Sequence, residues 1–276
     1  MKTCFKWQGN KSKQLKYLTK EIPAQYNTYI EPFVGSGALF LYLEPKKWII
    51  NDLNKYNYKI WKLIEKQPLK IKKEFLKFKE IFVPKSKKEK LLYCREKTFQ
   101  LNNSPVNYNF IITYLLMTYC VFLGQIVKKS RFVFQGLEMN IFSKNKYFFL
   151  TDTYFENIFE VSKFLNRGKG EILNKDYATI LKKAKKNDFV FMDPPYIEEH
   201  DYGFKYNRGE ILNNDFTEKL AKECKELDKR GVMWMMTQAD TKENRKIFKK
   251  YVVREYPVYR PGNKMFKKEL VIKNFE

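Results

Sequence analysis

An acid, two prolines and a tyrosine follow a short apolar run in the stretch DFVFMDPPYIEE, residues 188–199. The apolar run, 189–192, is typical of a short buried strand, so Asp193-Pro194-Pro195-Tyr196 would lie where that strand ends. Proline cannot continue a strand ladder, and it keeps the residue before it extended. We therefore expect a stiff turn that presents one carboxylate, one carbonyl with no competing N–H beside it, and one aromatic face.

This set of groups suits a reaction at the exocyclic amine of a nucleobase, whose lone pair is delocalised into the ring. The carboxylate of Asp193 and the carbonyl of Pro194 could accept the amine hydrogens and stabilise the positive charge that develops on nitrogen. The ring of Tyr196 could stack on the base. A base in duplex DNA would have to leave the stack to reach such a turn. An ordinary Asp-Pro turn is the alternative interpretation.

A glycine-rich turn, Phe33-Val34-Gly35-Ser36-Gly37, follows an earlier apolar run. Two glycines after a strand let the backbone approach a ligand closely at the start of a helix. The turn lacks the third glycine of the dinucleotide fingerprint. Asp52 comes about one βα unit later, where an acid can bind the ribose hydroxyls of a nucleoside. A capping or turn aspartate would explain Asp52 equally well.

The elements that must position these residues indicate an α/β fold. Each end of the chain alternates apolar runs with helical periods. We expect strand, glycine turn and helix over 28–43, a strand over 47–54, strand, acid and helix over 170–184, a helix over 215–231 capped by Asp215, a strand over 232–239, and a terminal hairpin over 251–274.

The middle of the chain, roughly 55 to 165, is rich in lysine and aromatic residues and mostly helical by period. Apolar spacing predicts helices over 54–67 and 71–82, with breaks at Pro84 and at 102–107. The apolar stretch 110–124 is too short and too polar to span a bilayer, so we expect a buried helix. Residues 123–142 read as loop or hairpin with a basic tip. The middle region would therefore interrupt an α/β domain.

The charge balance favours a polyanionic partner. Lys and Arg number 54 against 31 Asp and Glu, a formal net charge of +23 in 276 residues. Such an excess is typical of proteins that bind nucleic acid, although a lysine-rich proteome would also produce it. Four scattered cysteines and one histidine argue against a metal site. No apolar segment opens the chain, so we expect a cytoplasmic protein, bacterial or in a viral replication compartment, that is neither secreted nor membrane-bound.

Three motifs together resemble the Dam-like, class alpha, DNA adenine-N6 methyltransferases, which use S-adenosylmethionine. FKWQGNKSKQL (5–15), EPFVGSGALF (31–40) and DPPY (193–196) match in the order of that family. The end, YRPGNKMFKKELVIKN, resembles the family's closing hairpin, although Gly262 and Asn263 stand in reversed order. The resemblance implies a Rossmann-like methyltransferase sheet, mostly parallel with a C-terminal antiparallel hairpin. Residues 1–54 and 166–276 would form this catalytic domain, and 55–165 an inserted, mostly helical target-recognition domain.

The resemblance also implies a set of site residues. Asp193, Pro194, Pro195 and Tyr196 would form the catalytic turn. The cofactor would be bound by Trp7 and Lys11 at its methionine end, by Phe33, Gly35 and Gly37 along the loop, by Asp52 at the ribose, by Asp176 near the adenine, and by Asp193. A core tryptophan, a surface lysine and an N-cap aspartate are the plain alternatives for Trp7, Lys11 and Asp176.

Two further groups would contact DNA. Lys128, Lys129 and Arg131 form the basic tip of the middle region, and an arginine there could bind guanine. A solvated charge run is the ordinary alternative. In the family, an aromatic loop after the catalytic turn closes over the extruded base, and Tyr202, Phe204 and Tyr206 hold the corresponding positions here. They could equally be aromatic residues packed under a surface loop.

The resulting expectation is a monomeric enzyme that methylates N6 of an adenine flipped out of double-stranded DNA. G-A-T-C is the first recognition sequence to test, because many Dam-like relatives read it, and a cognate restriction endonuclease is a candidate partner. One alternative is an RNA or protein amide methyltransferase that uses the same turn; the large insert and the K-W-x-G-x-K segment favour DNA. The other is a catalytically silent nucleic-acid-binding module, against which the intact Asp193 and Tyr196 argue.

Overall fold

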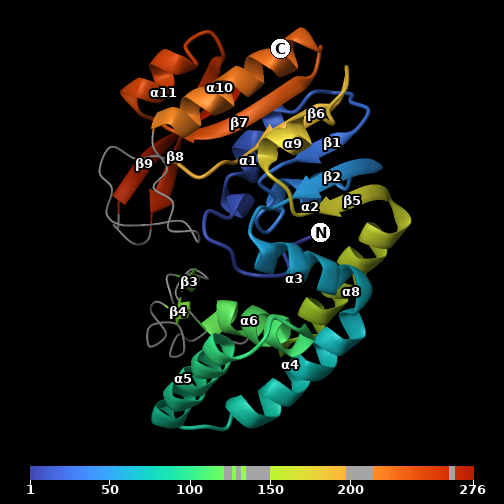
Figure 1. Cartoon of the computed structure of the whole chain (residues 1–276), viewed down its shortest axis with the longest axis vertical. Helices are drawn as coiled ribbons and strands as arrows, with labels where there is room; N and C mark the ends of the chain where they lie inside the picture. The colour runs from blue at the N-terminus through green and yellow to red at the C-terminus, as the bar shows by residue number, and fades with distance from the viewer. Residues whose placement is uncertain (121–125, 129–131, 135–149, 197–213, 261–264) are drawn as a thin grey trace.

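The computed structural model describes residues 1–120, 126–128, 132–134, 150–196, 214–260 and 265–276. Its centre is a seven-stranded sheet in the order β5-β2-β1-β6-β7-β9-β8 (Figure 1). The strands are β1 (Tyr29–Glu31), β2 (Lys47–Asn51), β5 (Lys169–Leu173), β6 (Phe189–Met192), β7 (Met233–Ala239), β8 (Val252–Arg260) and β9 (Met265–Lys273).

Strands β5, β2, β1, β6 and β7 are parallel, and β9 and β8 continue the sheet as an antiparallel hairpin. This mixed sheet confirms the predicted fold class. From β1 the chain runs to β2 on one side, and it later enters β6 on the other side. The β1–β6 pair is therefore the switch point of the sheet, and α/β proteins bind ligands at the carboxyl edge of such a point.

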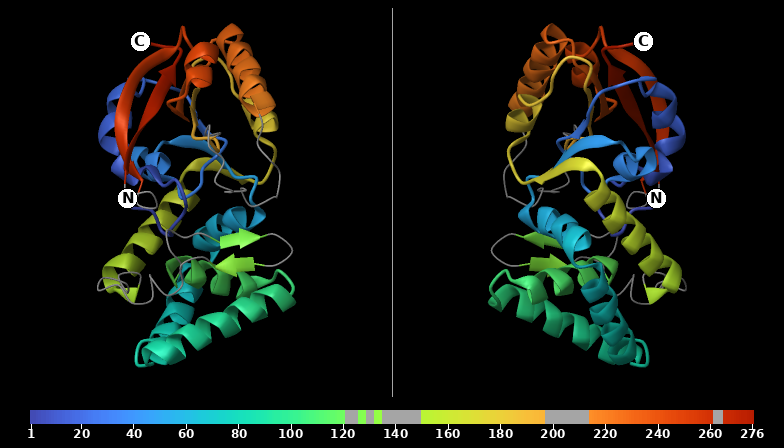
Figure 2. Two further views of the ribbon diagram at one scale, coloured as in Figure 1. Left: turned by 90° about the vertical axis from the view of Figure 1, so that its left-hand side faces the viewer. Right: turned by 90° about the vertical axis from the view of Figure 1, so that its right-hand side faces the viewer.

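Helices cover both faces of the sheet (Figure 2), as alternation along the strands requires. Tyr29 and Phe191 belong to the core on one face, and Ile30 and Val190 to the core on the other. The first face is covered by α1 (Leu15–Leu18), α2 (Ala38–Leu43), α3 (Lys55–Lys66) and α8 (Asp152–Arg167), and the second by α9 (Tyr177–Leu181), α10 (Asn214–Lys229) and α11 (Lys242–Ile247).

The middle region holds three more helices, which extend away from the sheet in Figure 1. They are α4 (Pro68–Phe82), α5 (Lys87–Asn103) and α6 (Tyr108–Cys120). The predicted helices over 54–67 and 71–82 correspond to α3 and α4, and the chain breaks near Pro84 as expected. A short antiparallel pair, β3 (Ile126–Lys128) and β4 (Phe132–Phe134), confirms part of the predicted hairpin.

Helix α5 was not predicted, because its apolar residues do not line one face. Three of its residues, Lys90, Cys94 and Leu101, are buried, while Leu92 and Phe99 are exposed. Its start does carry a local signal. Ser86 accepts the N–H of Glu89, and the Glu89 carboxylate accepts the N–H of Ser86. This capping box is readable as S-x-x-E, so the sequence could have marked where the helix begins.

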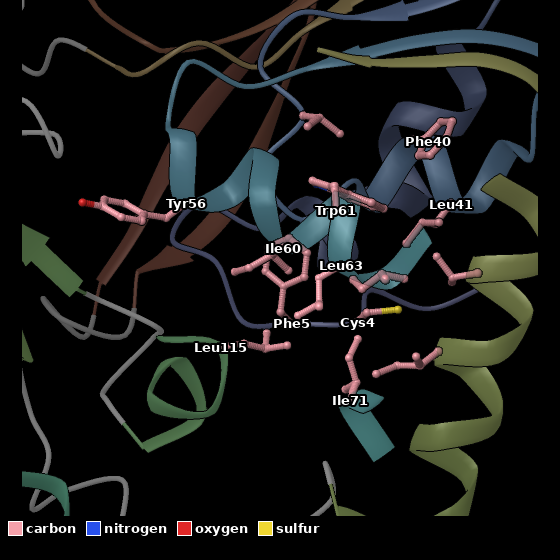
Figure 3. Packing of buried hydrophobic residues seen from close by; sticks show 14 of the residues in the cluster. Cys4, Phe5, Phe40, Leu41, Tyr56, Ile60, Trp61, Leu63, Ile71 and Leu115 are labelled. Carbon is pink, nitrogen blue, oxygen red and sulfur yellow. The ribbon is translucent and has the colours of Figure 1, made fainter. Parts of the chain in front are cut away.

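The first residues of the chain are locked into the core between the sheet and the helices of the middle region. Figure 3 shows Cys4 and Phe5 among side chains from α2, α3 and α6. The Trp61 ring is fully buried and lies edge-on to Phe5, with centroids 5.7 Å apart. The hydroxyls of Tyr119 and Tyr154 both donate to the carbonyl of Cys4. These contacts fix the start of the segment that carries Trp7 and Lys11.

Three smaller findings complete the fold. Helix α10 begins at Asn214, so Asp215 lies in the first turn of the helix instead of capping it, which corrects the expectation. All four cysteines are free and buried. Within the described ranges, no helix is long and apolar enough to cross a bilayer, and no group of His, Cys, Asp and Glu is arranged to hold a metal ion.

Candidate functional site

Asp193 follows directly on β6, at the carboxyl edge of the sheet. Three side chains contact one of its carboxylate oxygens, Oδ1. The Lys11 ammonium lies 2.8 Å away, Thr237 donates its hydroxyl at 2.7 Å, and Tyr196 donates its hydroxyl at 3.2 Å. Among the described residues no donor contacts Oδ2, and the side chain is 18% exposed. One face of this carboxylate is therefore fixed by the protein, and the other can accept from a ligand.

The N-terminal segment bridges the catalytic turn and the glycine turn. Asn10 donates its side-chain amide to the hydroxyl of Ser36 at 2.8 Å, and its neighbour Lys11 reaches Asp193. Lys11 also donates to the carbonyl of Gly9 at 3.1 Å and is 6% exposed. Strands β1 and β6 pair directly, so the two turns leave the sheet side by side. The predicted proximity of Asp193 to the 33–37 turn is therefore found.

The two glycines of this turn adopt left-handed backbone conformations. The φ angle is +49° at Gly35 and +66° at Gly37, and a side chain at either position would collide with a tryptophan. A Cβ on Gly35 would lie 2.8 Å from Cδ1 of Trp7, and one on Gly37 would lie 2.7 Å from Cζ2 of Trp61. Only glycine satisfies both requirements. Trp7, partly exposed, thus packs directly on the backbone of Gly35.

Asp52 follows β2 and closes the glycine turn from the other side. Its carboxylate accepts the N–H of Gly35 at 3.1 Å and the N–H of Asn54 at 2.8 Å, and it is also bonded by the side-chain amide of Asn57. Burial raises the pKa of Asp52 to about 6, against the opposing effect of these hydrogen bonds. The side chain remains half-buried. The structure therefore shows the turn role of Asp52, and its contact with a ribose stays a prediction.

Asp176 caps helix α9, where its carboxylate accepts the N–H of Ala178 at 2.9 Å. It is exposed and lies beside the end of β2, because the buried side chain of Asn51 bonds both the N–H and the carbonyl of Lys175. The ring of Phe33, partly exposed, packs 5.4 Å from the ring of the neighbouring Tyr177. The ring of Phe33 and the carboxylates of Asp52 and Asp176 thus lie along one edge of the sheet.

Two side chains to which sequence reasoning gave no role hold the 193–196 turn in place, although Glu269 fits the family's closing hairpin motif. Thr237 is a fully buried polar residue in the apolar strand β7, and Glu269 is a buried acid in the apolar end of β9. The Glu269 carboxylate accepts hydroxyls from Tyr256 at 3.0 Å and from Tyr196 at 3.2 Å. Burial, reinforced by Asp193 and then Glu269, raises the pKa of Tyr196 well above its usual value. Tyr196 therefore remains a neutral donor. A lone polar residue within an apolar strand was the available signal.

The residues expected to contact DNA lie largely outside the described part of the chain. Lys128 ends β3, where its backbone pairs with Phe132. Lys129, Arg131, Tyr202, Phe204, Tyr206 and the histidine at 200 fall outside the described residues. Their roles stay predictions.

The groups at this edge fit a nucleoside cofactor with a charged tail. Asp52 offers a half-buried carboxylate to a diol, Phe33 offers a partly exposed aromatic face to a base, and Gly35 brings the backbone close. Such a set is typical of nucleoside-binding α/β proteins, which bind their ligand at this edge of the sheet.

Comparison with known proteins identifies the family within this class of α/β proteins. Residues 7–260 match the D12 class N6 adenine-specific DNA methyltransferase family, and the chain belongs to that family. It is 27% identical over 251 residues to the type II methyltransferase M1.LlaDCHI of Lactococcus lactis subsp. cremoris, an alignment that covers 89% of this chain and 84% of that protein. It is 24% identical over 281 residues to the DNA adenine methylase of Haemophilus influenzae, covering 97% and 91%.

Among solved structures, an rRNA methyltransferase from Streptomyces viridochromogenes, named aviRa, aligns with 95% of this chain and 84% of its own. The TM-score is 0.41 and the sequence identity 10%, a similarity too low to bear on substrate or mechanism.

Proposed function

We propose that this chain transfers a methyl group from S-adenosylmethionine to the N6 amine of an adenine flipped out of double-stranded DNA. The observation that carries the proposal is the half-satisfied carboxylate of Asp193, held beside the glycine turn of β1. Family membership gives the reaction class, adenine-specific DNA methylation. The cofactor, the extruded base and the residue roles are the finer parts of the proposal.

The cofactor would lie along the carboxyl ends of β1 and β2. Asp52 would accept its ribose hydroxyls, and Phe33 would contact its adenine, with Asp176 nearby. Trp7 would shape the loop at the methionine end through its packing on Gly35. Bound there, S-adenosylmethionine supplies an electrophilic methyl group on a positively charged sulfur. Lys11, whose ammonium is directed at Asp193 and Gly9, would border this end of the site.

The target amine would be held by the catalytic turn. Oδ2 of Asp193 and the carbonyl of Pro194 would accept its two hydrogens, and both prolines would keep these acceptors in place without reorganisation. The amine nitrogen becomes positively charged as its new bond forms, and the adjacent carboxylate stabilises that charge. The surplus proton then leaves to Asp193 or to solvent. Tyr196, anchored through its hydroxyl, would stack on the extruded base.

DNA would be held by the middle region, residues 55–165, which we propose as the target-recognition domain. Lys128, Lys129 and Arg131 would contact phosphate or guanine, and Tyr202 and Tyr206 would close over the base. Extrusion costs a few kcal/mol of stacking, which phosphate contacts would partly offset. A DNA substrate would place the protein in the cytoplasm of a bacterium or in a viral replication compartment. A monomer and a cognate restriction endonuclease complete the proposal.

The test is single-turnover transfer of a radiolabelled methyl group to unmethylated duplex oligonucleotides with and without G-A-T-C. RNA of the same sequence and a glutamine-containing peptide represent the alternative methyltransferases. Asp193→Ala should abolish transfer and leave cofactor binding mostly intact, whereas Asp215→Ala, at an exposed aspartate on α10, should change neither. Transfer that survives Asp193→Ala would contradict the proposal. Sequencing of modified bases in DNA from an expressing host would then give the position and context.

A further inference from the structure

The side chain of Asn10 lies between the two turns of the proposed site. Its amide nitrogen donates to the hydroxyl of Ser36 at 2.8 Å and to the hydroxyl of Thr3 at 3.3 Å. Its side-chain oxygen accepts the N–H of Ser12 at 2.7 Å and so caps the 3-10 helix η1 (Lys11–Lys13). One side chain therefore bonds the glycine turn and also begins the short helix that carries Lys11.

The hydroxyl that Asn10 contacts belongs to a buried residue. Ser36 stands between the two glycines of the turn and is 3% exposed. A hydroxyl buried to this degree is costly to leave without a hydrogen bond, and the amide of Asn10 supplies one. Asn10 therefore holds the glycine turn from the side of the N-terminal segment, whereas Asp52 holds it through the N–H of Gly35.

Asn10 also fixes the residue that follows it, Lys11. Asparagine is a favoured N-cap because its side-chain oxygen accepts a backbone N–H of the first turn. The cap holds the start of η1, from which the ammonium of Lys11 reaches the carboxylate of Asp193 at 2.8 Å. A misplacement of about 1 Å near a catalytic group can lower a rate about a hundredfold. Moving Asn10 would therefore disturb both the glycine turn and the contact at Asp193.

The family resemblance gives residue 10 no role, because it occupies a variable position of K-W-x-G-x-K. We propose that Asn10 is a positioning residue that couples the glycine turn of the proposed cofactor site to the Lys11–Asp193 contact. Cofactor bound along the turn would hold Ser36 and, through Asn10, the peptide that leads into Lys11. By reciprocity, the Lys11–Asp193 contact would favour the turn conformation that binds the cofactor. The coupling rests on the proposed function, whereas the bond between Asn10 and Ser36 is a property of the protein alone.

The first measurement is the kinetics of Asn10→Ser, Ser36→Ala and the double variant. Serine at residue 10 keeps an N-cap oxygen but is too short to reach Ser36. For each single variant we expect kcat at saturating cofactor and DNA to fall about tenfold, and the dissociation constant of S-adenosylmethionine to rise about threefold. The double variant should resemble the single ones, because the same bond is removed in all three.

Asn157→Ala is the matched control. Asn157, on α8, accepts the N–H of Lys2 at 3.0 Å and donates to the carbonyl of Lys2 at 2.9 Å. It ties the same N-terminal segment to the body of the protein, and its hydrogen bonds go to neither turn of the site. Its loss should lower the urea midpoint but leave kcat and the cofactor dissociation constant within about twofold of wild type. The control thus separates a loosened segment from a lost position.

The second measurement needs neither cofactor nor DNA. Urea unfolding is compared for wild type, Asn10→Ser, Ser36→Ala and the double variant. The loss of midpoint in the double variant should be clearly smaller than the sum of the two single losses, because the bond between the side chains is lost only once.

The outcomes separate the two proposals. Losses of kcat and of midpoint that are both less than additive support the coupling. Additive losses in either cycle, or a kcat of Asn10→Ser equal to that of Asn157→Ala, would overturn it. A wild-type protein that transfers no methyl group to DNA would overturn the proposed function and with it the role in transfer, while the unfolding cycle would still decide the bond between Asn10 and Ser36.

Discussion

The ammonium of Lys11 lies 2.8 Å from the carboxylate of Asp193, although one residue belongs to a 3-10 turn near the N-terminus and the other follows the fourth strand of the sheet in order. This ion pair joins the two most widely separated motifs of the chain. It places Lys11 at the acid of the 193–196 turn, whereas the family resemblance implied a position at the methionine end of the cofactor.

Lys11→Met is expected to destabilise the protein by about 3–5 kcal/mol, because it removes the ammonium that contacts the largely buried carboxylate of Asp193. Methyl transfer should fall at least about a hundredfold, since Asp193 loses the group that orients it. Urea unfolding and single-turnover transfer measure the two effects. Lys13→Met, at an exposed position of the same turn, should be neutral in both. If Lys11→Met were as stable as Lys13→Met, the ion pair would not be part of the folded core.

The raised pKa of Asp52 predicts how the affinity for the proposed cofactor depends on pH. Burial raises its pKa from 3.8 to about 6, so its carboxylate takes up a proton as the pH falls through about 6. The ionised form is the better acceptor for ribose hydroxyls. Cofactor affinity should therefore fall below pH 6, by up to about tenfold per pH unit. Isothermal titration between pH 5 and 8 checks this, and Asp52→Asn should show weak binding with little pH dependence.

Stability should change with pH in the opposite sense at the same residue. Because the folded protein favours the protonated form of Asp52, the contribution of this group to stability is greatest below its unfolded pKa and is lost as the pH rises from about 4 to about 6. Loss of binding at low pH can thus be separated from unfolding. Tighter cofactor binding at pH 5 than at pH 8 would contradict the proposed role of Asp52.

Much of the sheet could be predicted because its signals are local. The strand before the DPPY turn, the glycine turn after β1 and the acid after β2 are each visible within ten residues. Asp176 shows where local reasoning stops: the sequence allows an N-cap or a cofactor contact, and the structure demonstrates the cap. Helix α5 was not predicted individually, because its apolar residues do not repeat on one face of the helix.

The cluster around Asp193 could not be predicted from local pattern. It depends on the spatial order β6-β7-β9, which brings Thr237 and Glu269 beside Asp193, and on the packing of Tyr17 against Tyr256, with ring centroids 5.1 Å apart. Strand order is decided by which hydrophobic faces can be buried together across the whole chain. An isolated acid in an apolar strand indicates only that some partner must exist.

Gly9, Gly35 and Gly37 all have positive φ angles. Alanine substitutions at these positions can therefore separate the free-energy cost of backbone strain from the cost of a side-chain collision. Gly9 has φ +79°, and a Cβ at this position would meet nothing within 4 Å, so Gly9→Ala should cost about 1 kcal/mol of strain alone. Gly35→Ala adds a collision with Trp7, which is partly exposed and can shift. Gly37→Ala adds a collision with the fully buried Trp61, so we expect the largest cost, about 2–4 kcal/mol.

Urea unfolding should therefore rank the three variants Gly9, Gly35, Gly37 in order of increasing cost. Cofactor affinity should follow a different order, with Gly35→Ala the most affected relative to its stability, because it displaces Trp7 and disturbs the N–H that Asp52 accepts. Equal cofactor affinity for Gly9→Ala and Gly35→Ala would mean that the backbone at residue 35 does not border the cofactor.

The carbonyl of Cys4 couples the middle region to the segment that carries Trp7 and Lys11. It accepts hydroxyls from Tyr119 on α6 and Tyr154 on α8, and the two hydroxyls are themselves hydrogen-bonded at 2.9 Å. Either Tyr119→Phe or Tyr154→Phe alone should cost about 1 kcal/mol, because one donor remains. The double variant should cost clearly more than the two together, because it leaves a buried carbonyl unpaired, at about 1–3 kcal/mol extra. A double-mutant cycle on urea unfolding measures the coupling. Strictly additive effects would show that the two tyrosines neither share this acceptor nor contact each other in solution.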